Sequence, residues 1–502
     1  MEVRKALQSA FRPSAPAFLS AVTALALPLL FSTPNAISQT NPSSVVNPYF
    51  GSVTVQPIRD SNQTDNQAVN DQPLKLSLDD AIARGLKNNL GLIEAESGEK
   101  TIAGERKQAL QEFLPTITLN GDTGYYQHNL AALGFSPSVV ARFAKLLPNA
   151  PKNFPSITRD DLTEGQISMS QTLFSGPVFA AYKASNAAVK SAYFAKMTAR
   201  GEVVQQVATV YLRSIAAESD VENAKVLVAQ DQLSFDHAHQ EHLAGTIANL
   251  EELRAKVQLE NQQQLLISDQ NQLEKDLILL KREIGINPGQ QIELTDPAPY
   301  SDLAEQTPEE LRAVAYKSRQ DYQNLQNQLI EYKNIHAAYR SQRWPTLTFS
   351  SSWSTETVNG AGTHGVFSAM GTLKLPIFRE ASLRGQSDAS LAQMDAVNAQ
   401  LSDLRDHIDQ QVRAALLDVE AGRKLVEVAR SNVDLATRAL SDETDRVNAG
   451  VDDNLPLVTA QATLASAQTN LVESLYQYNV SKLALARAAG VLEAEYRDYL
   501  GR

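Results

Sequence analysis

Two stretches of the sequence are too long and too free of proline to belong to an ordinary compact domain. Residues 178–244 and 379–449 contain no proline over 67 and 71 positions. An uninterrupted helix of either length spans about 100 Å, at 1.5 Å of rise per residue. Because proline disrupts helix interiors and globular helices are far shorter, the sequence predicts two very long helices.

The chain also contains two similar halves. The segment 114–119 (LPTITL) resembles 344–349 (WPTLTF) at an offset of 230, and the same offset relates the helix starts 77–80 (SLDD) and 307–310 (TPEE). The offset then falls to 204 or 205, which relates three further pairs of positions: Phe174 and Phe378, Gly245 and Gly450, and Gly285 and Gly490. This pattern indicates a tandem duplication with an insertion of about 26 residues in the first half, placed in a loop over Tyr125–Asp161.

Each half is predicted to contain a helix, a strand, a loop, a second strand, the long helix, a tight turn and a final helix. The shorter helices are expected at 77–112, 246–284, 308–343 and 456–489, so that two short helices stacked end to end match one long helix. Every seventh residue of the final helices is apolar, which favours packing against neighbouring helices; these residues are Leu259, Leu266, Leu273 and Leu280, and Leu457, Leu464, Leu471, Tyr478 and Leu485.

The predicted strands alternate between apolar and hydroxyl-bearing residues. They lie at 115–125 and 344–354, with return strands at about 165–174 and 366–375. This alternation suits the wall of a membrane barrel, and it equally suits a half-buried sheet of a soluble protein. Four strands cannot close a barrel, so a membrane barrel requires several chains: eight strands from a dimer leave a filled interior, and twelve from a trimer leave a channel.

The N-terminus has the pattern of a secretory signal peptide. Basic residues precede the apolar run Phe18–Phe31, and Ala36-Ile37-Ser38 fits a cleavage site. The alternative is a buried N-terminal helix. We therefore expect a signal peptide at 1–38, a flexible leader at 39–73, a first repeat at 74–290, a second at 291–490 and a C-terminal tail at 491–502.

The composition excludes several classes of function. Acidic residues (57) outnumber basic ones (45), and the formal net charge of −12 argues against nucleic-acid binding through a basic surface. The absence of cysteine excludes disulfides, thiolate metal sites, a cysteine nucleophile and a lipid-modified N-terminal cysteine. No nucleophile motif, phosphate loop or zinc-protease helix occurs, so we expect no enzyme activity, no cofactor and no metal.

The duplicated motifs together resemble the TolC-like outer-membrane efflux proteins of Gram-negative bacteria. The similarity includes the two helix starts, the two strand entries, the exit 171–176 (QTLFSG) and the turn 450–455 (GVDDNL) followed by Ala460-Gln461. It implies a mainly α fold with a small β part: a homotrimer with a periplasmic α-barrel and a 12-stranded outer-membrane β-barrel. It also implies a passive exit duct that docks to a periplasmic adaptor and an inner-membrane pump, with the insertion at the outer mouth.

The tight turns of the two halves are the candidate functional positions. The resemblance places Gly245, Thr246, Gly450 and Val451 in contact with the adaptor, although glycine also simply suits a left-handed helix end. Asp452 and Asp453 are candidates for a pore constriction, since rings of carboxylates favour cations; the alternative is a solvated turn. Family members carry constricting aspartates six and nine residues after the glycine, where this chain has Pro456 and Thr459.

Histidine and tryptophan give weaker signals. His237, His239 and His242 precede the first turn, and although a metal site is conceivable there, solvent-facing polar residues are the simpler interpretation. Trp344 and Trp353 fit either membrane-interface anchors or ordinary sheet packing. A periplasmic coiled-coil scaffold without membrane contact is the alternative function; it explains the helices but leaves the alternating strands unexplained.

Overall fold

The computed structural model describes residues 72–129, 157–297, 300–358, 362–449 and 454–501. The chain divides into two units, residues 1–61 and 62–502, and all described residues lie in the second. The predicted signal peptide and nearly all of the predicted leader lie outside the described residues. No helix in the described part of the chain is both long and apolar enough to cross a membrane.

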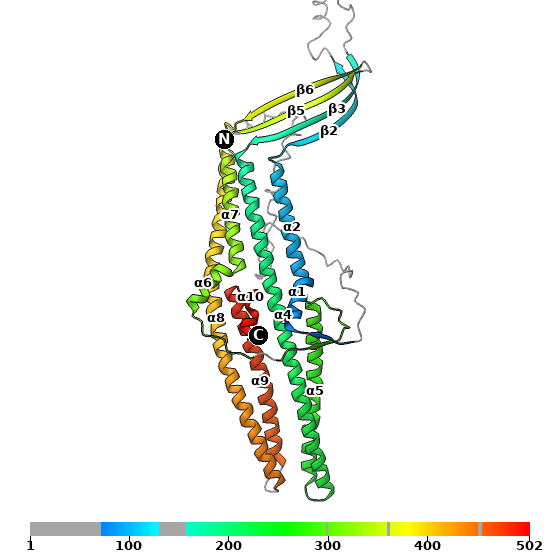
Figure 1. Cartoon of the computed structure of the whole chain (residues 1–502), viewed down its shortest axis with the longest axis vertical. Helices are drawn as coiled ribbons and strands as arrows, with labels where there is room; N and C mark the ends of the chain where they lie inside the picture. Colours follow the sequence, from blue (N-terminus) through cyan, green and yellow to red (C-terminus); the bar gives the residue numbers. More distant parts are fainter. Residues whose placement is uncertain (1–71, 130–156, 298–299, 359–361, 450–453, 502) are drawn as a thin grey trace, which may run out of the picture. The chain divides into compact units, whose positions relative to one another are not determined.

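The two predicted long helices are confirmed. Helix α4 (Gly176–Leu243) has 68 residues and α8 (Glu380–Asn448) has 69, and neither is interrupted (Figure 1). Each follows a strand of the sheet, α4 after one intervening residue and α8 after five. The start of α4 is marked by Pro177 within the first turn, where a missing backbone N–H costs nothing.

The shorter helices differ from the sequence prediction in one respect. Helices α5 (Asn249–Glu283) and α9 (Asn454–Ala489) are continuous as expected. The other two expected helices, 77–112 and 308–343, are each broken in two at one residue with extended backbone, Asn89 or Arg319. The four resulting helices are α1 (Leu78–Asn88), α2 (Leu90–Gln111), α6 (Pro308–Ser318) and α7 (Gln320–Ser341).

A glycine at the end of a neighbouring helix sits against each break. After α5, Gly285 has φ +70°, and a Cβ on it would lie 2.6 Å from the Cβ of Asn88. After α9, Gly490 has φ +76°, and its Cβ would lie 2.7 Å from the backbone nitrogen of Arg319. The side chain of Asn88 also donates to the carbonyl of Ile284 at 3.1 Å. The breaks are therefore where the short helices meet, with α2 and α5 following each other along α4.

The four predicted strands form one antiparallel sheet in the order β2-β3-β5-β6. Their bounds are β2 (Thr116–Asn129), β3 (Ile157–Phe174), β5 (Thr346–Val358) and β6 (Thr363–Lys374). Strands β2 and β3 are longer than expected, so both margins of the loop predicted at Tyr125–Asp161 are strand. The rest of the predicted loop, 130–156, lies outside the described residues.

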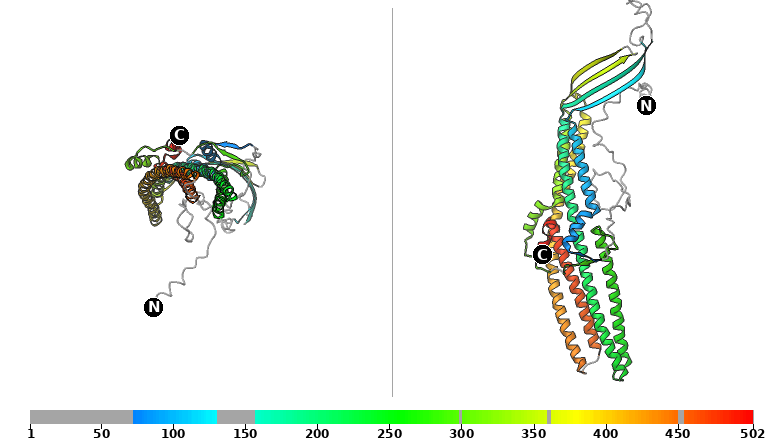
Figure 2. Two further views of the ribbon diagram at one scale, coloured as in Figure 1. Left: turned by 90° about the horizontal axis from the view of Figure 1, so that it is seen from below. Right: turned by 45° about the vertical axis from the view of Figure 1, so that its right-hand side comes forward.

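The sheet has one apolar and one hydroxyl-rich face. Register pairs Leu119 with Ile167 and Trp353 with Phe367 on the apolar face. On the other face, hydroxyls bond across strands, as between Thr118 and Ser168 at 2.7 Å. Because each strand adjoins α2, α4, α7 or α8, the sheet continues from one end of these helices (Figure 2).

The structure adds elements that the sequence analysis does not predict. A parallel pair of short strands, β1 (Leu74–Leu76) and β4 (Ile292–Leu294), joins the starts of the two repeats. Helix α10 (Leu492–Leu500) occupies the segment expected to be a C-terminal tail. Both lie at the main hydrophobic core, which includes the fully buried Tyr211 and Tyr478.

Candidate functional site

The turn between α4 and α5 is a glycine-terminated helix end. Gly245 has φ +75°, and its N–H donates to the carbonyl of His242 at 2.9 Å. The N–H of Thr246 donates to the carbonyl of Glu241 at 3.0 Å, and the Thr246 hydroxyl donates to the same oxygen at 2.8 Å. This pair of backbone bonds is the Schellman motif. The sequence prediction of a tight turn at Gly245 and Thr246 is confirmed; its contact with an adaptor stays a prediction.

A glutamate joins the two helices beside this turn. Glu252 of α5 lies 2.7 Å from the Nδ1 atom of His239 and 3.8 Å from the Nε2 atom of His242, both on α4. His239 and His242 therefore share a helix face, as expected from their spacing. The Glu252 side chain is 18% exposed, so these contacts form in a partly dehydrated position across the turn.

The remaining histidine of this segment is separate. His237 lies 3.5 Å from Glu241, one turn along α4, and is largely exposed. Within the described ranges, no group of three or more His, Cys, Asp or Glu side chains is arranged to hold a metal ion. The observed role of these histidines is to form polar contacts near the turn.

The second turn is described only on its flanks. Gly450, Val451, Asp452 and Asp453 lie outside the described residues, so the structure does not test the predicted adaptor contact or constriction there. The end of α8 is acidic, with Asp442 and Asp445 exposed and Glu443 partly buried near Arg446. Ala449 caps α8 by donating its N–H to the carbonyl of Asp445 at 3.0 Å.

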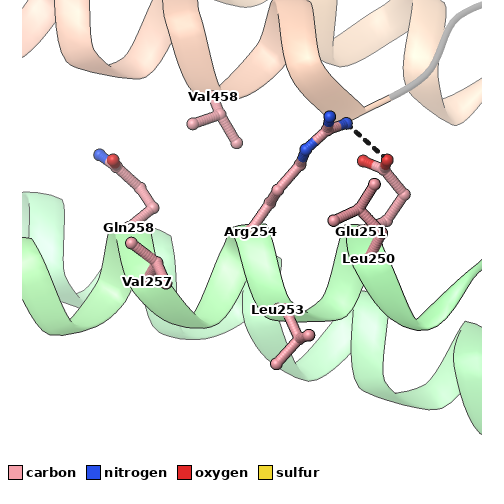
Figure 3. A pocket seen from close by; sticks show the side chains of 7 residues that line it. All are labelled: Leu250, Glu251, Leu253, Arg254, Val257, Gln258 and Val458. Atoms are coloured by element: carbon pink, nitrogen blue, oxygen red, sulfur yellow. Dashed lines mark hydrogen bonds and ion pairs between the residues drawn. The ribbon is translucent and has the colours of Figure 1, made fainter.

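A cavity lies between α5 and α9 close to these turns. It has a volume of about 360 Å³ (Figure 3). The lining is mostly apolar, and one guanidinium crosses it: Arg254 donates to Glu251 at 2.7 Å. The lining residues are Leu250, Glu251, Leu253, Arg254, Val257, Gln258 and Val458. The sequence analysis missed this cavity, although apolar residues at 250, 253 and 257 share one helix face and could have indicated it.

The helices around the turns pack through the predicted seven-residue repeat. Leu457 and Leu464 of α9 are buried against Ala436 and Leu440 of α8. Polar side chains interrupt the seam of α4 with α9, where the side chain of the buried Gln461 donates to the Ser234 hydroxyl at 3.1 Å. Packing near the turns is therefore thinner and more polar than in the main core.

Three carboxylates approach one another farther along the helices. Burial raises the pKa of Asp220 on α4 to about 6, and the charges of Asp269 on α5 and Glu473 on α9 add to this effect. A raised pKa such as that of Asp220 can accompany catalysis, but it also arises from ordinary burial of an acidic residue in a helix seam. We assign no chemistry to this group.

The two tryptophans lie at the sheet. Trp344 precedes β5 and is 56% exposed, and Trp353 on the apolar face of β5 is 50% exposed. Neither is enclosed by the packing of a single chain. Membrane-interface anchoring of these residues stays a prediction.

Comparison with known proteins identifies the family. The family described as "Outer membrane efflux protein" matches residues 81–285 and 313–491. No curated protein matches the sequence. Similar solved structures include a membrane protein from Pseudomonas aeruginosa, with 19% identity, a TM-score of 0.69 and coverage of 82% of this chain and 93% of the other.

Two further solved structures are similar over the same extent. The outer membrane protein VceC of Vibrio cholerae has 17% identity and a TM-score of 0.68, covering 82% of this chain and 96% of its own. The outer membrane channel CmeC of Campylobacter jejuni has 15% identity and a TM-score of 0.68, covering 84% and 89%. The shared fold and the two matched segments, one for each half of the duplication, show that this chain belongs to the outer membrane efflux protein family of TolC-like channels.

Proposed function

We propose that this protein is the exit duct of a tripartite efflux system or a type I secretion system, located in the cell outer membrane. It provides a passive route for small molecules or polypeptides and has no enzyme activity. The observation that carries this proposal is a four-stranded sheet with two open edges, joined at one end to helices about 100 Å long.

The open edges favour assembly with other copies. Strands β2 and β6 each have one neighbour in the sheet, and unpaired backbone groups are costly in lipid. Three copies supply twelve strands, which enclose a water-filled interior, whereas two copies supply eight and leave it filled by side chains. We therefore favour a homotrimer with its apolar sheet face toward outer-membrane lipid and its helices extending into the periplasm.

The helix turns at the far end are the proposed docking surface for a periplasmic adaptor protein, which in turn links the duct to an inner-membrane pump. The turn residues are Gly245, Thr246, Gly450 and Val451. The neighbouring cavity supports this assignment, because an exposed apolar surface with a polar rim is typical of a protein-binding site. Asp452 and Asp453 remain our candidates for a cation-selective constriction.

The mass of the detergent-solubilised complex tests the central claim. We expect three copies and no release from membranes into detergent-free buffer. Release as a lone protomer without detergent would instead favour the periplasmic scaffold. Separately, Asp452→Ala with Asp453→Ala should change conductance and cation preference in planar bilayers; unchanged values would remove the constriction from the proposal and leave the duct.

A further inference from the structure

We propose that β6 pairs with β2 of a second copy of the chain in one defined antiparallel register, with Lys374 opposite Asn120 and Val366 opposite His128 of that copy. The inference rests on the proposed homotrimer and specifies the surface through which its copies meet. It follows from the duplication, because one chain already contains the equivalent contact between its own two hairpins.

The two hairpins of the sheet are the same unit. Thr116 of β2 lies opposite Ser170 of β3, and Thr346 of β5 lies opposite Lys374 of β6. Adding the sequence offset of 230 to Thr116 gives Thr346, and adding the offset of 204 to Ser170 gives Lys374. Those offsets come from motifs in the strand entries and exits, so the agreement shows that both hairpins kept one register after duplication.

The contact between β3 and β5 joins the first hairpin to the second within the chain. Its register pairs Leu162 with Val358 and Ser170 with Ser350. Adding 204 to a residue number in β3 gives the equivalent residue of β6, and subtracting 230 from one in β5 gives the equivalent residue of β2. The two pairs then become Val366 with His128 and Lys374 with Asn120. In a ring of identical chains, that contact joins the second hairpin of one copy to the first hairpin of the next.

The apolar pattern agrees with this register independently of the offsets. Leu373 lies on the apolar face of β6, since it pairs with Leu347, and Gly121 lies on the apolar side of β2 with Leu119. The proposed register places Leu373 opposite Gly121, so that apolar faces meet across the contact. A slip of one residue would place the apolar face of β6 beside the hydroxyl-rich face of β2.

Charge and side-chain size also match across the proposed contact. Lys374 and Asp122 are both exposed edge residues, and the register makes them diagonal neighbours on the hydroxyl-rich face. Large residues meet small ones at successive positions, with Met370 opposite Gly124 and Ala369 opposite Tyr125. Such pairs fill a strand interface without crowding it.

Cysteine cross-linking tests the register directly, because the chain has no cysteine of its own. Residues directly opposite each other in an antiparallel pair have Cα atoms about 4.5–5.5 Å apart, within reach of a disulfide, whereas diagonal residues about 7–8 Å apart are not. The designed variants are Thr372→Cys with Asp122→Cys and Gly371→Cys with Thr123→Cys. Because opposite residues alternate between hydrogen-bonded and non-hydrogen-bonded pairs along an antiparallel ladder, two adjacent pairs include one of each kind.

The matched controls keep Thr372→Cys and shift its partner by two residues, to Asn120→Cys or Gly124→Cys. After oxidation in membranes, at least one designed pair should give a covalent complex with three times the monomer mass that is lost on reduction. The shifted controls should stay mainly monomeric on the same denaturing gel. The mass of each variant's detergent-solubilised complex is also measured, to establish that the variant has assembled.

The outcomes separate this proposal from the proposed function. Three copies by mass with cross-links from a shifted control, or with none from either designed pair, would overturn the register and leave the homotrimer intact. Cross-links from a designed pair in a complex with another number of copies would support the register and overturn the homotrimer. A lone protomer by mass would overturn both.

Discussion

Replacing Gly490 with alanine is expected to destabilise the protein far more than the same change at Gly245. Gly490 follows α9 and Gly245 follows α4, and both have nearly the same left-handed backbone, with φ +76° and +75°. Their surroundings differ. A Cβ on Gly490 would lie 2.7 Å from the backbone nitrogen of Arg319, whereas a Cβ on Gly245 would have no heavy atom within 4 Å.

The expected loss of stability has two parts, the cost of the left-handed backbone and the cost of crowding around the new Cβ. A residue with a Cβ loses about 1–2 kcal/mol in the left-handed conformation, and both variants carry this cost. Overpacking adds about 1–3 kcal/mol, and it applies at Gly490 alone, because a backbone atom of Arg319 cannot rotate away. We therefore expect a loss of about 2–5 kcal/mol for Gly490→Ala and about 1–2 kcal/mol for Gly245→Ala.

Chemical denaturation of the purified protein in detergent, followed by helical circular dichroism, measures the difference. Gly104→Ala serves as a control, because Gly104 lies inside α2 with no heavy atom near its Cβ position. That variant should gain about 1 kcal/mol from helix propensity. Equal losses for Gly490→Ala and Gly245→Ala would refute the idea that close packing at the helix break requires glycine.

Three further changes test buried charges. Arg319→Ala leaves the partly exposed Asp321, now 2.6 Å from the guanidinium, without its cation. The free energy of unfolding should fall by about 1.5–3 kcal/mol, measured from the denaturation midpoint. Burial lowers the pKa of Lys482 to about 8. Since the unfolded chain binds this proton more tightly, the free energy of unfolding of the wild type should rise by up to about 3 kcal/mol between pH 8 and 10.5. Lys482→Met should abolish that rise in a series of denaturation curves across this pH range. Burial, with the charge of Glu105, raises the pKa of Glu331 to about 7. Because the folded chain then binds this proton more tightly than the unfolded chain, wild-type stability should fall as pH rises from 4.5 to 7. An equal fall in the denaturation midpoint of Glu331→Gln over the same pH range would contradict this.

Several features of the protein are properties of local sequence. The long helices α4 and α8 follow from stretches without proline, and the seven-residue spacing of Leu457 and Leu464 predicts the face that packs on α8. The duplication predicts the order of elements, and the alternation along the strands predicts the two faces of the sheet. Each of these signals is carried by neighbouring residues, so it survives in the sequence as a pattern.

Other features exist only because distant segments meet. The breaks at Asn89 and Arg319 have no proline beside them; they form where the ends of α5 and α9 abut the shorter helices. The contact of Glu252 with two histidines and the cavity between α5 and α9 likewise join residues of different helices. Sequence patterns determine which face of each element is apolar, but the position where one helix ends against another depends on packing distances that no local pattern records.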